Sequence, residues 1–265
     1  MGLGRFGGGV DAAQFAAKVA ARVIVTDMAP EEKLGESVGK LRGWPNVEFH
    51  LGSHDRADFE RADVVVANPA VAPDNPFLEI ARRNGKVVTS QIGIFFQLCP
   101  ARIVGITGAN GKSTTTALTA HLLENAHRPK PFGKVWLSGN IGEQPLLTIL
   151  DRIVPDDVVV LELSSFQIEQ LAHVQRAPHI SLLTNLTPNH LDRYGTFEAY
   201  CASKEGIFKY QKPDGDSPAI SLFNAEDAVA SHWFGRYGVQ PGRTCSLYSA
   251  DDVAPDVRQA YTLPG

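Results

Sequence analysis

A glycine-rich loop followed by a lysine and two hydroxyl side chains is the segment of this sequence that most clearly indicates chemistry. The loop Gly108-Ala109-Asn110-Gly111-Lys112-Ser113-Thr114 comes directly after the apolar run 102–107. Glycines let backbone amides approach phosphate oxygens, and a helix that begins at the lysine adds a favourable dipole. Lys112 supplies a charge for the distal phosphates, and Ser113 or Thr114 offers a hydroxyl to Mg²⁺. The loop therefore predicts a nucleoside triphosphate site.

The spacing of this loop departs from the strict phosphate-loop pattern GxxxxGK[ST], because position 106 is isoleucine. A chance Gly-Lys-Ser turn is the alternative interpretation. The order of apolar strand, glycines and helix argues against chance, since a phosphate loop requires this local context.

Three more polar residues follow apolar runs along the chain. Asn140 lies in Gly139-Asn-Ile-Gly142 after the run 134–137, Glu162 ends the run 158–161, and His190 follows the run 179–184. In an open parallel sheet, ligands collect outside the carboxyl ends of the strands. We therefore expect these residues to share one site with Lys112 and Ser113.

Each of these polar residues has a structural alternative. Asn140 could occupy a left-handed turn between glycines, and His190 could have a capping or surface role. Ser164 and Gln167 have the spacing of a capping box, so Ser164 could simply start a helix. Glu162 is harder to explain structurally, because a carboxylate that ends a buried strand needs a partner, and Mg²⁺ beside a nucleotide is a natural one.

A lysine on the apolar face of a predicted helix gives an independent signal. The segment 196–210 has an apolar stripe with helical spacing, and Lys204 lies on that stripe. The stripe consists of Phe197, Tyr200, Cys201, Ile207 and Phe208. Lysines are rarely buried without a partner, so this pattern indicates either an active-site lysine or a stem that reaches solvent at the helix edge, and the family resemblance described below favours the first.

The N-terminal glycines form a second candidate nucleotide motif. Gly2-x-Gly4-x-x-Gly7 matches a dinucleotide fingerprint, and Asp27 follows Gly7 by 20 residues at the end of the next predicted strand. An acidic residue there would bond a ribose hydroxyl. The alternative is a tight strand-to-helix turn in which Asp27 is an ordinary polar strand end.

Strands and helices alternate along the chain. The runs 22–26, 62–67, 102–107 and 157–161 are predicted strands, and 10–21, 75–84 and 112–126 are predicted helices. This predicts an α/β fold, with an N-terminal Rossmann-like parallel-sheet domain over 1–98 and a P-loop-type central ATPase domain over 99–265. The chain begins inside a glycine-rich turn with no strand before it and stops in a polar stretch, so we expect a fragment.

Composition excludes several classes of protein. The net charge is −4 with no basic stripe, which argues against nucleic-acid binding. No apolar stretch reaches the roughly 18 residues that cross a bilayer, so we expect no membrane insertion. The 3 cysteines are far apart and form no CxxC pair, which favours reduced thiols in a cytoplasmic protein.

Taken together, the motifs resemble the Mur ligases, the ATP-dependent ligases of peptidoglycan precursor synthesis. The resemblance is weak over the first hundred residues and specific over 100–210, and it is strongest toward the members that add D-glutamate to UDP-N-acetylmuramoyl-L-alanine. The matching strings are Gly105-Ile-Thr-Gly-Ala-Asn-Gly-Lys-Ser-Thr114, Gly139-Asn-Ile-Gly142, Leu161-Glu-Leu-Ser-Ser-Phe-Gln167, and Asn189-His-Leu-Asp-Arg-Tyr194 followed by Lys204.

The resemblance implies that ATP phosphorylates the carboxylate of UDP-N-acetylmuramoyl-L-alanine and that the amine of D-glutamate attacks the resulting anhydride. It implies catalytic roles for Lys112, Glu162, His190 and Lys204. Lys112 would stabilise the γ-phosphate, Ser113, Glu162 and His190 would hold or flank Mg²⁺, and a carbamylated Lys204 would bridge the metal ions. The expected substrate contacts are Gly4, Arg5, Phe6, Asp27, Asn68, Asn140 and Ser164.

The sequence also departs from the family. Asn189 stands where an acidic residue often precedes the histidine, and the third domain, which contributes to binding ATP and the amino acid in this family, has no counterpart before residue 265. Three other interpretations stay open: a nucleotide-binding module without chemistry, an NAD-dependent oxidoreductase built on the N-terminal glycines, and a Mur-type ligase for another amino acid.

Overall fold

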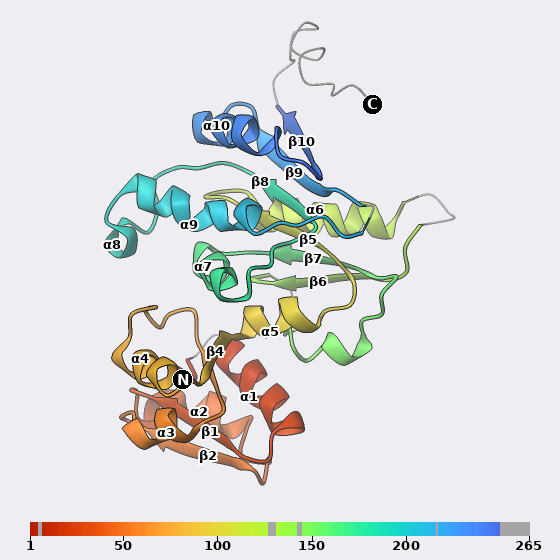
Figure 1. Cartoon of the computed structure of the whole chain (residues 1–265). Coiled ribbons are helices and arrows are strands. Elements are labelled where there is room, and N and C mark those ends of the chain that lie inside the picture. Colours follow the sequence, from red (N-terminus) through yellow and green to blue (C-terminus); the bar gives the residue numbers. More distant parts are fainter. Residues whose placement is uncertain (5–6, 127–130, 142–144, 216, 250–265) are drawn as a thin grey trace, which may run out of the picture. The chain divides into compact units, whose positions relative to one another are not determined.

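The computed structural model describes residues 1–4, 7–126, 131–141, 145–215 and 217–249 and divides the chain into two compact units (Figure 1). The first unit comprises Met1–Pro100 together with Gly142–Ile153, and the second comprises Ala101–Ile141 together with Val154–Gly265. The chain thus passes from the second unit back into the first after Ile141, a return for which the sequence motifs carry no signal.

The first unit contains two pairs of parallel strands and the helices that cover them. β1 (Val23–Asp27) pairs with β2 (Val47–Leu51), and β3 (Val64–Ala67) pairs with β4 (Val87–Ser90). The helices are α1 (Gly8–Val19), α2 (Glu31–Gly39), α3 (Arg56–Arg61), α4 (Pro76–Arg83), α5 (Gln91–Leu98) and the short 3₁₀ helix η1 (Leu150–Arg152).

Met1 and Gly2 join the two strand pairs of the first unit by hydrogen bonds. The amide of Gly2 donates to the carbonyl of Thr26 in β1 (2.8 Å), and the terminal ammonium of Met1 donates to the carbonyl of Val66 in β3 (2.9 Å). The amide of Asn68 in turn donates to the carbonyl of Met1 (3.0 Å). The first residues therefore take a strand's place between β1 and β3, where the sequence alone suggested only a turn.

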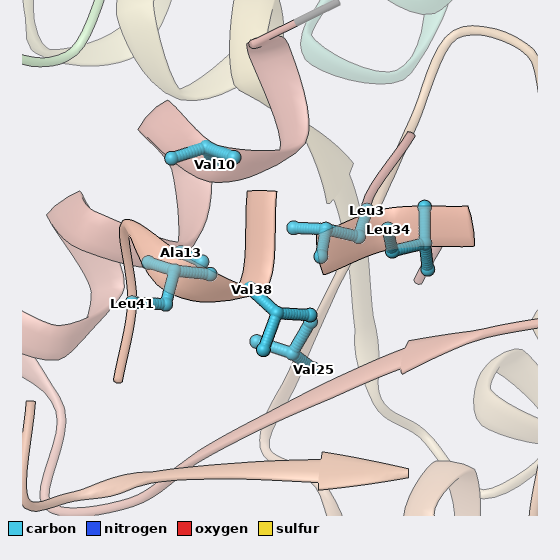
Figure 2. Packing of buried hydrophobic residues seen from close by; sticks show 7 residues of the cluster. All are labelled: Leu3, Val10, Ala13, Val25, Leu34, Val38 and Leu41. Carbon is cyan, nitrogen blue, oxygen red and sulfur yellow. The ribbon is translucent and has the colours of Figure 1, made fainter. Parts of the chain in front are cut away.

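The core of the first unit is built from helical and strand periodicity (Figure 2). Val10 and Ala13 are three residues apart on α1, and Leu34 and Val38 are four apart on α2, so each pair projects from one helix face. These faces pack around Val25 of β1. The cluster is completed by Leu3 and Leu41.

The second unit is a six-stranded parallel sheet in the order β10-β9-β8-β5-β7-β6. Its strands are β5 (Arg102–Thr107), β6 (Val135–Gly139), β7 (Val158–Glu162), β8 (Ile180–Leu183), β9 (Ala219–Asn224) and β10 (Arg243–Tyr248). Its helices are α6 (Lys112–Glu124), α7 (Ser165–Val174), α8 (Leu191–Tyr194), α9 (Phe197–Lys209) and α10 (Ala228–Tyr237). The predicted α/β class with parallel sheets is confirmed.

Helices cover both faces of this sheet. Val104 and Ile106 of β5 pack with Ala120 of α6 on one face. On the other face, the hydroxyl of Ser181 in β8 donates to the carbonyl of Ile207 in α9 (3.1 Å). Because both faces are buried, the strands need apolar residues at nearly every position, which is the pattern seen in the sequence.

The order of the strands sets where a ligand can bind. After β5 the chain turns toward β6 and β7, whereas after β8 it turns toward β9 and β10 on the other side. Adjacent strands whose connections diverge in this way open a crevice at their carboxyl ends. The glycine-rich loop follows β5 and the segment carrying His190 follows β8, so both border this crevice.

Within the described part of the chain, none of the helices combines the length and the apolar character that a membrane span requires.

Candidate functional site

The glycine-rich loop connects β5 to α6 and is anchored by the residues that follow β8. The amide of Ala109 donates to the carbonyl of Asn185 (2.8 Å), and the amide of Asn110 donates to the Asn185 side chain (3.0 Å). A Cβ atom on Gly108 would lie 1.9 Å from the hydroxyl oxygen of Thr184, so only glycine fits there. The loop is therefore held in shape from across the crevice.

Gly111 ends the loop in a left-handed conformation and directly precedes α6, which begins at Lys112. The Lys112 ammonium donates to the carbonyl of Ala109 (3.0 Å), so this side chain folds back over the loop. Ser113 and Thr114 are exposed in the first turn of the helix. The predicted phosphate-binding residues thus form one continuous strand–loop–helix element.

Glu162 meets Ser113 and Asn140 at the carboxyl end of the sheet. The Ser113 hydroxyl donates to Oε2 of Glu162 (2.6 Å), and the Asn140 amide group donates to Oε1 (3.1 Å). The Glu162 side chain follows Val158 and Val160 on the face covered by α6, which brings it to the start of that helix. Its exposed fraction is 2%. The structure thus brings these three predicted residues together.

The left-handed interpretation of Asn140 is wrong. Within the described chain, the non-glycine residues with positive φ are Gln175 and His190. The backbone amide of Asn140 donates to the carbonyl of Glu162 (3.0 Å), which continues the pairing of β6 with β7 beyond Gly139. Asn140 is therefore fixed by both its backbone and its side chain to the same glutamate.

Lys204 lies on α9 at the opposite face of the sheet end, with an exposed fraction of 2%. Its ammonium donates to the hydroxyl of Thr107 (3.2 Å), which itself donates to the carbonyl of Leu163 (2.7 Å). Burial, and to a lesser extent the charge of Lys112, lowers the pKa of Lys204 from 10.5 to about 7. The alternative in which the ammonium reaches solvent is wrong.

His190 lies at the edge of this group of residues. It directly precedes α8 in a left-handed conformation (φ 52°), it is exposed, and its side chain makes no capping hydrogen bond to that helix. Its ring centroid is 5.0 Å from that of Phe166 and 6.4 Å from that of Tyr200. The Lys204 ammonium lies 5.1 Å from the Tyr200 ring centroid, so the tyrosine lies near both residues.

Ser164 forms the predicted capping box. Its hydroxyl accepts from the amide of Gln167 (3.3 Å), and its own amide donates to the Gln167 side chain (2.9 Å). This places the N-cap of α7 two residues beyond Glu162 and the first residue of the helix, Ser165, three residues beyond it. The Ser164 hydroxyl is thus engaged in the helix start, and its contact with substrate stays a prediction.

The candidate substrate residues of the first unit lie around the N-terminal glycines. Asp27 accepts from the amide of Gly4 (3.1 Å) at one carboxylate oxygen and from the amide of Ala29 (2.8 Å) at the other. The Asn68 side chain accepts from the amide of Ala70 (3.0 Å). Asp27 therefore fixes the glycine turn itself. Arg5 and Phe6 lie outside the described residues.

Sequence reasoning missed Thr107, Thr184 and Asn185. Each follows or ends an apolar strand, which is the same signal that singled out Glu162. Thr184 donates to the carbonyl of Asn110 (2.7 Å), and Asn185 accepts from the Asn110 amide. Their position at a strand end was the available signal.

The residues present fit a magnesium ion that arrives with a nucleotide. Glu162 is a buried carboxylate that accepts hydrogen bonds from an alcohol and an amide, both of which are uncharged. Within the described residues there is no group of three or more His, Cys, Asp or Glu that could enclose a metal. Mg²⁺ commonly takes one or two protein ligands and completes its shell with water and phosphate oxygens, so a sparse set of this kind suits it.

A parallel sheet with a glycine-lysine-serine turn at its crevice defines a P-loop-type α/β protein. Comparison with known families narrows this class, because residues 106–263 match the Mur ligase middle domain. The chain belongs to the Mur ligase family. The resemblance inferred from the motifs is thereby confirmed.

Two relatives are each named UDP-N-acetylmuramoylalanine--D-glutamate ligase. The protein from Roseiflexus sp. (strain RS-1) is 42% identical over 83% of this chain and 46% of its own length. The protein from Geobacter metallireducens is 37% identical over 89% of this chain and 49% of its own length. The chain thus spans about half the length of the curated relatives it matches.

Among solved structures, the UDP-N-acetylmuramate:L-alanyl-gamma-D-glutamyl-meso-diaminopimelate ligase from Neisseria meningitides has a TM-score of 0.57. It is 15% identical, and the match covers 96% of this chain and 80% of that one. At this identity the likeness concerns the fold alone.

Proposed function

We propose that this chain carries the nucleotide-binding and carboxylate-activating part of an ATP-dependent amide ligase that adds D-glutamate to UDP-N-acetylmuramoyl-L-alanine. The observation that carries the proposal is the group formed by Glu162, Ser113 and Asn140 at the end of the phosphate loop. A loop that only holds phosphate does not require a buried carboxylate on one side and a buried lysine on the other. The names of the relatives supply the substrate pair.

In the proposed reaction, a carboxylate oxygen of the terminal alanine attacks the γ-phosphorus of ATP and ADP leaves. The amine of D-glutamate then attacks the acyl carbon of the anhydride, inorganic phosphate leaves, and the nitrogen loses a proton to give the amide. Lys112 at the start of α6 would stabilise charge on the transferring phosphoryl group, together with the loop amides and the helix dipole.

Ser113, Glu162 and His190 are the proposed contacts of magnesium, which when bound would neutralise charge on the phosphate oxygens. Glu162 is already oriented for this task by its two uncharged donors. Asn140 holds Glu162 through one hydrogen of its amide group, and we assign its other hydrogen to the substrate carboxylate or the nucleotide. His190, exposed at the edge, would meet the ligand from the side of β8.

Lys204 is the proposed site of a carbamate. With a pKa of about 7, a large fraction of its side chain is the neutral amine near neutral pH. That amine attacks carbon dioxide, the N–C bond forms, and the nitrogen releases a proton. The product replaces a buried cation with an anion, which suits a position beside bound magnesium.

The proposed division of labour follows the two units. Residues 1–98 would bind the UDP precursor through Gly4, Arg5, Phe6, Asp27 and Asn68, and residues 99–265 would bind ATP. Because Asp27 already bonds the Gly4 amide, its contribution to nucleotide binding is partly the shape of the turn. A reaction that consumes ATP and a UDP-linked precursor belongs in the cytoplasm.

The test is a phosphate-release assay on the full-length gene product with ATP, UDP-N-acetylmuramoyl-L-alanine and a panel of amino acids. We expect release that depends strictly on D-glutamate and is lost in Glu162→Gln. Dependence on another amino acid would contradict the choice of D-glutamate. Tight ATP binding with no release for any amino acid would favour a nucleotide-binding module instead.

A further inference from the structure

We propose that Glu169 and Arg193 are positioning residues that fix the orientation of His190 through the ring of Phe166. The inference rests on the proposed ligase function, in which His190 faces the bound ligand. It concerns a set of contacts between α7 and α8 that none of the motifs predicted.

The backbone around His190 gives its side chain little support. α8 has four residues, His190 precedes it in a left-handed conformation, and the residue is exposed. A single helical turn is unstable by itself, and an exposed side chain samples several rotamers. A histidine that must meet a ligand from one direction therefore needs support from a neighbouring element.

That support comes from α7. The Phe166 ring lies 5.0 Å from the His190 ring, and the Arg193 guanidinium carbon lies 4.3 Å from the centroid of the same phenyl ring. Tyr194 also stacks on Phe166, with 6.0 Å between the ring centroids and 15° between the ring planes. His190, Arg193 and Tyr194 are spaced by three and four residues, so they project from one side of the turn.

Glu169 holds the guanidinium in this place. Nη2 of Arg193 is 3.1 Å from Oε2 of Glu169, and both side chains have an exposed fraction of 27%. Phe166 and Glu169 are three residues apart on α7, so one helix face presents both the ring and the carboxylate. A guanidinium can stack on the ring and bond the carboxylate at once because it is planar, which an ammonium cannot do.

This set of contacts connects His190 to the catalytic glutamate. α7 begins at Ser165, three residues after Glu162, and its capping box fixes that start. Because α8 packs against α7, the position of α8 and of His190 is fixed relative to the strand that carries Glu162. A half-buried ion pair contributes little to the net stability of a protein, so the proposed role of the Glu169–Arg193 pair is to orient the His190 side chain.

The test measures the His190 ring directly and the reaction separately, in the full-length protein. The variants are Arg193→Ala, Arg193→Lys and Glu169→Gln. Arg236→Lys is the matched control, because Arg236 and Glu205 also form an ion pair (2.6 Å) in the second unit. NMR of the imidazole C–H groups reports the ring-current shift from Phe166, and phosphate release gives kcat and the KM for ATP.

We expect Arg193→Ala to move the His190 ring signals toward those of a free histidine and to lower kcat by about 10- to 100-fold, as for residues that orient a ligand-binding side chain. The KM for ATP should change less than about twofold, and Arg193→Lys should lie between alanine and wild type. The control should change neither measurement. If Arg193→Ala does not fold, Arg193→Lys and Glu169→Gln give the same comparison.

Unchanged ring signals in a folded variant would overturn the proposal, whether or not kcat falls. Altered ring signals with an unchanged kcat would overturn it as well. If the wild-type protein releases no phosphate with any amino acid, the proposed function fails, while the NMR comparison still decides whether Glu169 and Arg193 orient His190.

Discussion

Replacing Lys204 with methionine should stabilise the protein while removing its proposed activity. Methionine has a similar length and no charge, so it fits the buried position without a desolvation cost. The difference between the ordinary lysine pKa of 10.5 and the lowered value of about 7 corresponds to about 5 kcal/mol at about 1.4 kcal/mol per pH unit. Relaxation of the protein around the charge reduces this energy, so we expect the free energy of unfolding of the methionine variant to exceed that of wild type by about 2–3 kcal/mol at pH 7.

The sign of the effect determines its pH dependence. Between pH 10.5 and about 7, the unfolded chain binds a proton at Lys204 that the folded chain does not. The wild-type free energy of unfolding therefore rises with pH across this window, and below about pH 7 the cost of burying the ammonium is constant. The advantage of the methionine variant should be largest near pH 7 and should shrink as the pH approaches 10.5.

Urea unfolding near neutral pH and at a pH about two units higher, in buffer free of carbon dioxide, measures this directly. Lys209→Met is the matched control, because Lys209 is an exposed lysine on the same helix. A Lys204 variant that is less stable than wild type at pH 7, or whose advantage does not fall with pH, would refute the argument from burial. Undiminished turnover in Lys204→Ala would refute the carbamate, and partial recovery with short carboxylates would support it.

Four further substitutions test the loop and the first unit. Lys112→Ala should remove Mg²⁺-dependent ATP binding in a titration with little loss of fold; unchanged affinity would contradict the phosphate-loop assignment. Asn185→Ala should weaken ATP binding by about 5- to 10-fold, since each lost loop hydrogen bond costs about 1 kcal/mol, and an affinity equal to wild type would show that the loop holds its shape alone. Asp11→Asn should lower the free energy of unfolding, measured in urea, by about 2–4 kcal/mol. The reason is that this buried carboxylate accepts from the Leu147 and Thr148 amides and from the Thr148 hydroxyl. Thr148→Val removes only one of these donors and should lower the free energy of unfolding by less.

The sequence predicts those parts of the site that local rules determine. Lys112 and Ser113 follow from a loop whose chemistry is contained in seven consecutive residues. Glu162 and Asn140 follow from strand ends, because parallel strands end at a common edge and converge there without further information. Lys204 follows from helical periodicity, since an apolar stripe determines which face is buried.

The parts that could not be predicted depend on contacts between distant segments. Asn185 bonds the Asn110 backbone across 75 residues of sequence, and the contact exists only because β8 lies beside β5 in the sheet. The same holds for the buried carboxylate of Asp11, which accepts from the amides of Leu147 and Thr148 more than 130 residues away. Local patterns carry no information on strand order. They therefore identify candidate site residues but not which residues contact one another in the folded protein.

In the proposed site, the counter-charge for Glu162 would come with the ligand. Among the described residues, the ion pairs include neither Glu162 nor Lys204, although each is almost fully buried. Glu162 is held by the uncharged donors of Ser113 and Asn140, which orient the carboxylate without neutralising it. Lys204 lies on the other face of the sheet end, where burial outweighs the attraction of Glu162 and lowers its pKa. A permanent salt bridge between the two would occupy the carboxylate that we propose for a magnesium–nucleotide complex, so their separation by the sheet would leave that carboxylate open to a cation supplied by the ligand.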